Sequence, residues 1–269
     1  MERLLHHERV TAPGESPGKW LYVLHGIYGA GRNWASVVRR VVRERPEWGG
    51  VLVDVRQHGA SQGFSPPHTV AAAAADLQRL GDAIGEPAGL LGHSFGGKVA
   101  LAYTRAAAFA GAVWIIDSTP APGERRGSAW RMLEVLRSLP DRFESRDAAV
   151  RALQQQGIEL PVAQWMATNL ARAHGGYGWR FRLDAMQELL EDFARADLWD
   201  VVEAPPAGAQ IHFVRAAESD VLTAAATEKI REAGRRNGRA HLHTLAGGHW
   251  LNADNPEGIV SLLTEHLPA

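Results

Sequence analysis

Gly92-His93-Ser94-Phe95-Gly96-Gly97 is the stretch of sequence that decides the fold. It follows a short apolar run, 88–91, and precedes a helical pattern, which is the strand, sharp turn and helix required around a nucleophile elbow. Such a turn strains the serine backbone and brings strand and helix close, so the positions two before and two after the serine must be small. Gly92 and Gly96 meet that need. We predict that Ser94 is a nucleophile, against the alternative of a Gly-rich turn that binds phosphate or only packs.

Apolar runs and helical patterns alternate on both sides of this turn. The apolar runs have four or five residues and are rich in Val, Ile and Leu, which is typical of strands buried on both faces. They cover 20–24, 51–55, 88–91, 112–116, 211–214 and 242–245, and helical patterns cover 33–45, 69–84, 95–109, 223–237 and 256–266. We predict an α/β fold with a mostly parallel central sheet flanked by helices, and a site beyond the carboxyl ends of its strands.

The alternation stops between about 122 and 200, where helical patterns follow one another. These patterns cover 128–138, 146–156, 161–173 and 183–195, and no convincing strand lies among them. Prolines at 120 and 122 with Gly123, and prolines at 205 and 206, punctuate the two ends. We predict a core formed by 1–122 and 198–269 and an inserted helical cap, 123–197, over the strand ends.

A second glycine turn, His25-Gly26-Ile27-Tyr28-Gly29, leaves the first buried strand. Acyl transfer through a serine needs two preorganised backbone N–H groups for the oxyanion, one from the residue after the nucleophile and one from an early loop. We predict Phe95 and Ile27 as these donors. The alternative is an ordinary glycine turn at a strand end.

The candidate general base is in Gly247-Gly248-His249-Trp250, after the last strand. A serine followed much later by a histidine is the chain order of this kind of site, and we predict His249 as the base. His241 and His243 share one strand face, but two ligands without a nearby carboxylate do not make a metal site, and none is expected. His25 and His93 flank the active loops, where we expect them to orient other groups.

The acid of the site has two candidates. The usual place follows the penultimate strand, with a small residue and then Asp three positions later, but counting from Ala216 gives Ser219, and Asp220 comes one position late. Asp117 directly follows the apolar run 112–116, beside the strand that carries the serine, where a carboxylate orients the imidazole. We favour Asp117 over Asp220. A cap on the turn that opens the insertion is the remaining interpretation of Asp117.

Composition narrows the classes of partner. With 29 basic and 30 acidic residues, and arginines scattered along the chain, the basic footprint of a nucleic-acid binder is missing. The absence of Cys excludes a disulfide framework, a thiol nucleophile and thiolate metal sites. The first ten residues carry charges and no apolar segment, and no run approaches the length of a membrane span. We expect a cytoplasmic protein that needs no cofactor, has no membrane span and acts on a small molecule.

These motifs together resemble one branch of the α/β-hydrolase superfamily, the small bacterial esterases and their mitochondrial abhydrolase relatives. The resemblance is carried by the His25–Gly29 loop, by 54–61, by the elbow with Gly97-Lys98-Val99-Ala100, by 116–120, by 213–215 with Ser219, and by 248–250. In that branch the acid is the Asp after strand six of the sheet, the strand that follows the elbow, and a Ser replaces it at the usual place. The resemblance therefore implies Asp117 as the acid and Ser219 as a supporting residue.

We expect a serine hydrolase that cleaves carboxylic esters of short to medium acyl chains, or thioesters, through an acyl-enzyme on Ser94. Apolar side chains in and beside the insertion, some of which must pack on the core, together predict an acyl pocket beneath the cap: Trp130, Trp165, Trp179, Trp199, Leu133, Leu136 and Met166. The alternatives are hydrolysis of a carbon–carbon bond by the same triad, and a non-catalytic receptor on a hydrolase scaffold. Dehalogenases and epoxide hydrolases need Asp in place of Ser94.

Overall fold

A seven-stranded sheet forms the centre of the core. The structure is a computed structural model that describes residues 3–269. The strand order is β1(His7–Val10), β3(Trp48–Val53), β2(Lys19–Leu24), β4(Gly89–His93), β5(Ala112–Ile116), β9(Gln210–Ala216) and β10(Ala240–Leu245). β1 pairs antiparallel with β3, and the remaining pairs are parallel. The predicted α/β fold with a mostly parallel sheet is confirmed.

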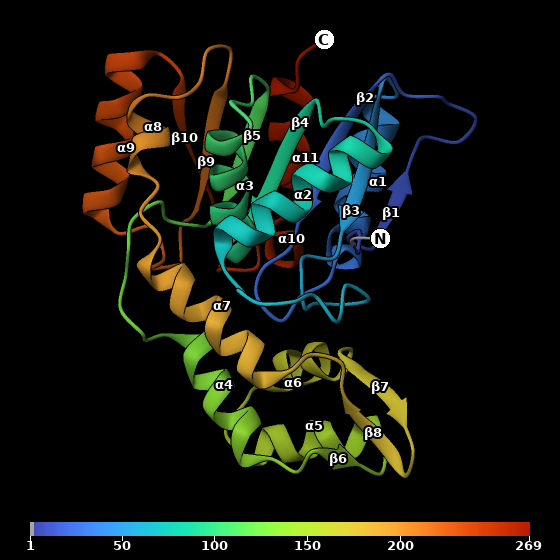
Figure 1. The fold of residues 1–269 in the computed structure, drawn as a ribbon. Helices are drawn as coiled ribbons and strands as arrows, with labels where there is room; N and C mark the ends of the chain where they lie inside the picture. The colour runs from blue at the N-terminus through green and yellow to red at the C-terminus, as the bar shows by residue number, and fades with distance from the viewer. Residues whose placement is uncertain (1–2) are drawn as a thin grey trace.

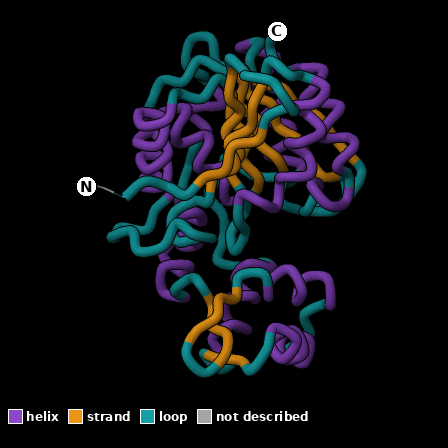
Figure 2. Tube along the Cα trace, turned by 90° about the vertical axis from the view of Figure 1, so that its right-hand side faces the viewer, coloured by secondary structure: helices purple, strands orange, loops and turns teal. Residues whose placement is uncertain are grey.

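Helices cover both faces of this sheet (Figures 1 and 2). One face packs against α1(Ala35–Glu44) and α11(Pro256–His266), whose valines and leucines form one apolar cluster with the strands. The other face packs against α2(Val70–Ile84), α3(Phe95–Ala106) and α9(Ala224–Asn237) in a second cluster. Short helices lie at the connections: η1(Gly31–Trp34), α8(Trp199–Glu203) and α10(Leu251–Asp254). Burial of these two apolar layers orients the sheet and fixes the ends of its strands.

The register of the central strands places two loop residues side by side. In β4 and β5, His93 lies opposite Ile116, and the next residues of the two strands are Ser94 and Asp117. The N–H of Ser94 donates to the carbonyl of Ile116 at 3.0 Å, which continues the ladder by one step. The predicted nucleophile and acid therefore emerge from neighbouring strand tips.

Two features of the sheet differ from the prediction. β1 has no counterpart among the predicted strands, because this edge strand is largely exposed and is held by backbone pairing with β3 rather than by an apolar pattern. β3 begins at Trp48, whereas the predicted strand began at 51, because the two glycines after Trp48 interrupt the apolar pattern. A Cβ on Gly50 would meet a methyl group of Val38 at 2.2 Å, so α1 packs directly on this backbone.

Residues 123–197, which we call the cap, form a second lobe below the core in Figure 1. The cap contains α4(Ser128–Ser138), β6(Arg142–Phe143), α5(Arg146–Gln155), α6(Leu160–Ala167), β7(Leu170–Ala173), β8(Gly176–Trp179) and α7(Leu183–Arg195). The expectation of a helix over 161–173, with no strand in the cap, was wrong. α6 stops at Ala167, and a hairpin turning at Gly175, where φ is +83°, pairs β7 with β8. These strands have four residues or fewer, too short for a period-two pattern to show in the sequence.

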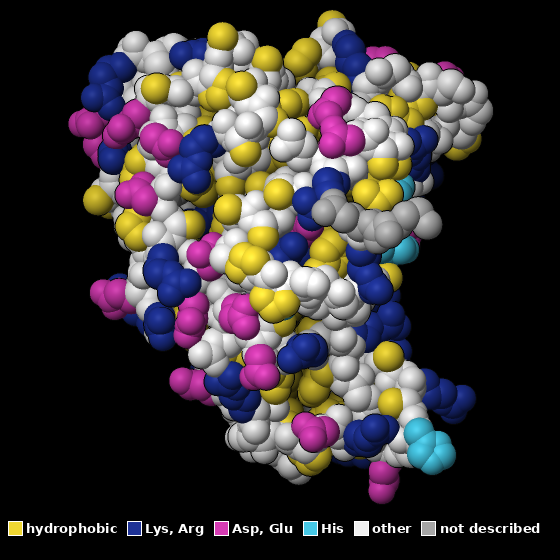
Figure 3. Space-filling view, viewed as in Figure 1, with side chains coloured by type: hydrophobic (Ala, Val, Ile, Leu, Met, Phe, Trp, Pro, Cys, Tyr) yellow, Lys and Arg dark blue, Asp and Glu magenta, His cyan; other side chains and the backbone are white. Residues whose placement is uncertain are grey.

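Acidic and basic side chains are interspersed on the face shown in Figure 3. No helix within residues 3–269 is long and apolar enough to span a bilayer. The charge distribution on this face agrees with the balanced composition of the chain.

Candidate active site

The turn after β4 holds Ser94 in a strained backbone conformation. Its φ is 51° and its ψ is −115°, and Ser94 is the N-cap of α3. The flanking glycines allow the close approach that this turn requires: a Cβ on Gly92 would lie 2.1 Å from the carbonyl oxygen of Gly96, and one on Gly96 would lie 2.5 Å from that of Leu24. The turn therefore has the geometry of a nucleophile elbow.

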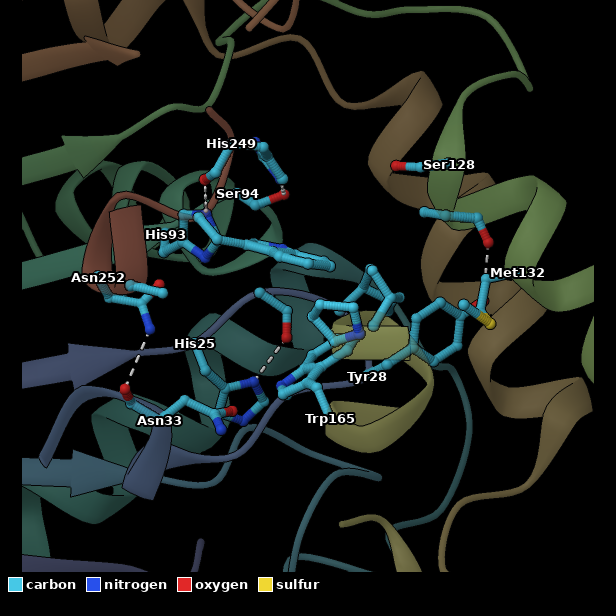
Figure 4. Close-up of a pocket in the computed structure, with 18 of the residues that line it drawn as sticks. His25, Tyr28, Asn33, His93, Ser94, Ser128, Met132, Trp165, His249 and Asn252 are labelled. Carbon is cyan, nitrogen blue, oxygen red and sulfur yellow. Dashed lines mark hydrogen bonds between the residues drawn. The ribbon is translucent and has the colours of Figure 1, made fainter. Parts of the chain in front are cut away.

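Ser94, His249 and Asp117 form one hydrogen-bonded chain (Figure 4 shows its first link). His249 Nε2 lies 3.0 Å from Ser94 Oγ, and His249 Nδ1 lies 2.7 Å from Asp117 Oδ2. Because an ionised carboxylate only accepts, the imidazole carries its proton on Nδ1. Nε2 is then free to accept the serine hydroxyl proton, which is the arrangement that activates a serine.

The carboxylate of Asp117 is fully buried and held by β9. The backbone N–H of Asp117 donates to the carbonyl of Val214 at 2.8 Å. The Oδ1 of its side chain accepts from the N–H of Ala216 at 3.1 Å. By contrast, Asp220 is exposed on the loop after β9. The hydroxyl of Ser219 accepts from Val221 at 3.3 Å, and nothing in residues 3–269 joins that hydroxyl to the triad. The structure thus brings Asp117 to the imidazole and leaves Asp220 and Ser219 outside.

His93 holds the loop that carries the imidazole. Its Nε2–H donates to the backbone carbonyl of His249 at 2.8 Å. Burial, followed by the nearby His249 ring, lowers the pKa of His93 to about 3, so this ring stays neutral and keeps that donor. The side chain before the nucleophile therefore fixes the position of the predicted base.

His25 fixes the loop of the predicted oxyanion donors. Val55 N–H donates to His25 Nε2 at 3.1 Å, so the ring proton is on Nδ1, which donates to the carbonyl of Gly26 at 2.7 Å. That carbonyl also accepts from the N–H of Gly29 at 3.0 Å. In a trans peptide the carbonyl and the following N–H point in opposite directions, so the Ile27 N–H is directed away from His25. It makes no hydrogen bond among the described residues and remains free for a ligand.

A cavity of about 490 Å³ opens beside Ser94 and His249 (Figure 4). Its walls come from both lobes and are mostly apolar: Ile27, Tyr28, Trp34, Ala129, Met132, Ile158, Pro161, Val162, Trp165, Trp250 and Ala253. Arg131 and Glu159, the charged residues of the lining apart from its histidines, are exposed. Among the tryptophans predicted for an acyl pocket, Trp165 lines the cavity, whereas Trp179 stacks on Phe181 within the cap.

Contacts between the cap and the active loops were missing from the prediction. Tyr28 Oη donates to the carbonyl of Ala129 at 3.0 Å, and Asn169 Nδ2 donates to the carbonyl of Tyr28 at 2.7 Å. The ring centroids of Trp165 and Trp250 are 5.3 Å apart, which joins α6 to the loop of His249. No sequence spacing reveals these pairs, because their members come from separate lobes.

The remaining histidines do not form a metal centre. His241 and His243 form a cluster of rings with His212 and His266 beside Trp114, on the sheet face covered by α11. The rings of His212, His241, His243 and Trp114 stack, and that of His266 is tilted against them. Within residues 3–269, no group of three or more His, Cys, Asp or Glu side chains is arranged to hold a metal ion.

Comparison with known proteins gives the same class as the fold and the site. The sequence profile of the alpha/beta hydrolase family matches residues 21–262. The sn-1-specific diacylglycerol lipase ABHD11 of Mus musculus is 29% identical over 254 residues, 91% of this chain and 79% of that protein. The lipase LipV of Mycobacterium tuberculosis is 31% identical over 241 residues, 84% and 85% of the two chains.

A solved structure, a marine microorganism esterase, superposes with a TM-score of 0.84 at 22% identity, covering 98% of this chain and 99% of that one. The chain belongs to the alpha/beta hydrolase family. Within that family it is an esterase-like hydrolase, as the sequence motifs predicted.

Proposed function

We propose that the protein hydrolyses carboxylic esters through an acyl-enzyme on Ser94. The observation that carries this proposal is the chain of hydrogen bonds from Ser94 Oγ to His249 at 3.0 Å and on to Asp117 at 2.7 Å, at the edge of an apolar cavity. Relatives named lipases and esterases support an ester as the substrate.

In the first half-reaction, Ser94 Oγ attacks the ester carbonyl carbon while His249 Nε2 takes the hydroxyl proton. The N–H groups of Ile27 and Phe95 stabilise the oxyanion of the tetrahedral intermediate. His249 then gives its proton to the alcohol oxygen as the C–O bond breaks. In the second half-reaction, His249 activates a water that attacks the acyl-enzyme and releases the acid and Ser94.

The cavity supports short to medium acyl esters or thioesters as substrates. Its volume of about 490 Å³ falls in the range of small-ligand sites, and its walls are apolar, with Arg131 and Glu159 exposed. Transfer of an uncharged acyl chain from water to these apolar walls is favourable.

Labelling with a fluorophosphonate probe and turnover of p-nitrophenyl butyrate test the proposal. The wild-type protein should be labelled and should release nitrophenol, and Ser94→Ala should lose both while keeping its melting temperature. Labelling that persists in Ser94→Ala would show a different nucleophile, and a wild-type protein that is not labelled would favour the receptor alternative. A labelled protein that cleaves no ester or thioester of an acyl-chain panel would favour carbon–carbon bond hydrolysis.

A further inference from the structure

Lys98 is a buried lysine that the proposed reaction does not use. It lies on α3, four residues after Ser94, and its side chain is fully buried. Its Nζ donates to the carbonyl oxygens of Ala121 at 2.7 Å, Phe193 at 2.7 Å and Ala196 at 2.8 Å. An ammonium group has three donors, so each of its hydrogens has an acceptor.

The three carbonyls lie at the two places where the chain passes between the core and the cap. Ala121 lies on the linker that leaves β5, and Phe193 and Ala196 lie at the C-terminal end of α7, where the chain returns. We call Lys98 Nζ and these three carbonyls the hinge clasp. It joins both linkers to the helix that begins at the proposed nucleophile.

The linkers also bind each other. Gly123 N–H donates to the carbonyl of Ala194 at 2.8 Å, and Leu198 N–H donates to that of Pro120 at 2.9 Å. The hinge clasp therefore acts on two paired segments rather than on two independent loops.

Lys98 keeps its charge at neutral pH even though its burial disfavours the charged form. The last carbonyls of α7 carry the negative end of the helix dipole, and the ring of Phe193 lies 4.5 Å from Nζ. Burial lowers the pKa of Lys98 to about 8, with Asp197 and Asp192 acting in the opposite direction. At neutral pH the side chain therefore keeps the three protons that the three carbonyls need.

We propose that Lys98 is a positioning residue that fixes the cap over Ser94 and so determines how well long acyl chains bind. This inference rests on the proposed function. An apolar side chain at 98 would leave three partly buried carbonyls without their donor, and we expect that cost to loosen the linkers. α4, which follows the outgoing linker, carries the cavity residues Ala129 and Met132. An acetyl group stays close to Ser94, whereas an octanoyl chain extends to these walls.

The first test compares Lys98→Met with Lys229→Met, which removes a partly exposed lysine paired with Glu203. In Lys98→Met the KM for p-nitrophenyl octanoate should rise about tenfold, while kcat for the acetate ester changes by less than about twofold. Lys229→Met should change neither. An unchanged KM for octanoate, or equal losses on both esters, would overturn the inference.

The second test uses the absence of cysteine from the chain. Lys98→Cys, alkylated with 2-bromoethylamine in denaturant and refolded, regains an ammonium of nearly the length of lysine, whereas 1-bromopropane gives a neutral side chain of the same size. The ammonium adduct should recover the wild-type KM for octanoate and the propyl adduct should not. Equal recovery by both adducts would contradict a role for the charge.

Hydrogen exchange in the wild-type protein keeps the inference testable if the variants do not fold. The N–H groups of Gly123 and Leu198 should exchange as slowly as those of β5, and exchange at the rate of exposed loops would refute the hinge clasp. Failure of the fluorophosphonate probe to label Ser94 would remove the proposed function but leave this exchange result unaffected, so the two failures can be distinguished.

Discussion

Replacing Asp117 with Asn should reverse the protonation of the His249 ring. The Ala216 N–H, which donates to Asp117 Oδ1 at 3.1 Å, would hold the amide oxygen of Asn at that position. The amide NH₂ would then face His249 Nδ1 at the 2.7 Å separation where the carboxylate now accepts. Because two donors cannot face each other there, the ring must carry its proton on Nε2, and Nε2 can no longer accept from Ser94.

We expect kcat for p-nitrophenyl butyrate to fall about 10⁴-fold, as in other triads with this substitution, which is about 5 kcal/mol of transition-state stabilisation. The fold should persist, because Asn keeps the shape of the side chain and its bond to Ala216. Steady-state kinetics with melting temperatures measures both quantities. Asp220→Asn, at an exposed position, is the matched control and should stay within about twofold of wild type. The reverse ranking would show that the acid is Asp220.

Two further predictions concern acid stability and substrate size. Burial lowers the pKa values of His58, His93 and His212 to about 3, so as the pH falls below 6.5 the unfolded chain binds up to one more proton than the native state at each of these rings, and stability decreases. At about 1.4 kcal/mol per histidine and pH unit, a domain of about 10 kcal/mol should unfold near pH 4. In a fluorescence titration, His212→Phe should lose stability less steeply than the wild-type protein as the pH falls, and an equally steep loss would contradict this prediction. Trp165→Ala, which enlarges the cavity, should raise the kcat/KM ratio of octanoate to butyrate esters about tenfold, and an unchanged ratio would place the acyl chain elsewhere.

The parts of the site that the sequence predicted are those fixed by short stretches of chain. The elbow could be predicted from the sequence because a buried strand, two glycines and a helix must follow one another around Ser94. Asp117 could be predicted because it directly follows β5, the strand that comes after the elbow in the chain. The register of β4 and β5 places it beside the serine. His249 is farther away in sequence, but it follows the last strand of the same sheet and so reaches the same edge.

The parts that the sequence did not predict depend on contacts between lobes or on backbone pairing alone. The cavity walls combine Trp165 of the cap with Trp250 of the core, and the hinge clasp joins Lys98 to carbonyls that have no sequence signature. Among residues 3–269, no hydrogen bond links the Ser219 hydroxyl to Asp117 or His249, and this hydroxyl accepts instead from the N–H of Val221. The short strands of the cap were read as helix because neighbouring helical patterns continued into them.

The placement of Asp117 has a consequence for how this protein can be re-engineered. It precedes the insertion, so Ser94 and the carboxylate both belong to one uninterrupted stretch of core, and only the imidazole comes from beyond the cap. A foreign lid grafted between the two linkers would leave that stretch intact, provided that its ends still offer Lys98 three carbonyls. Exchange of the cap between these linkers is thus a way to change the cavity walls while Ser94 and Asp117 keep their places in the core.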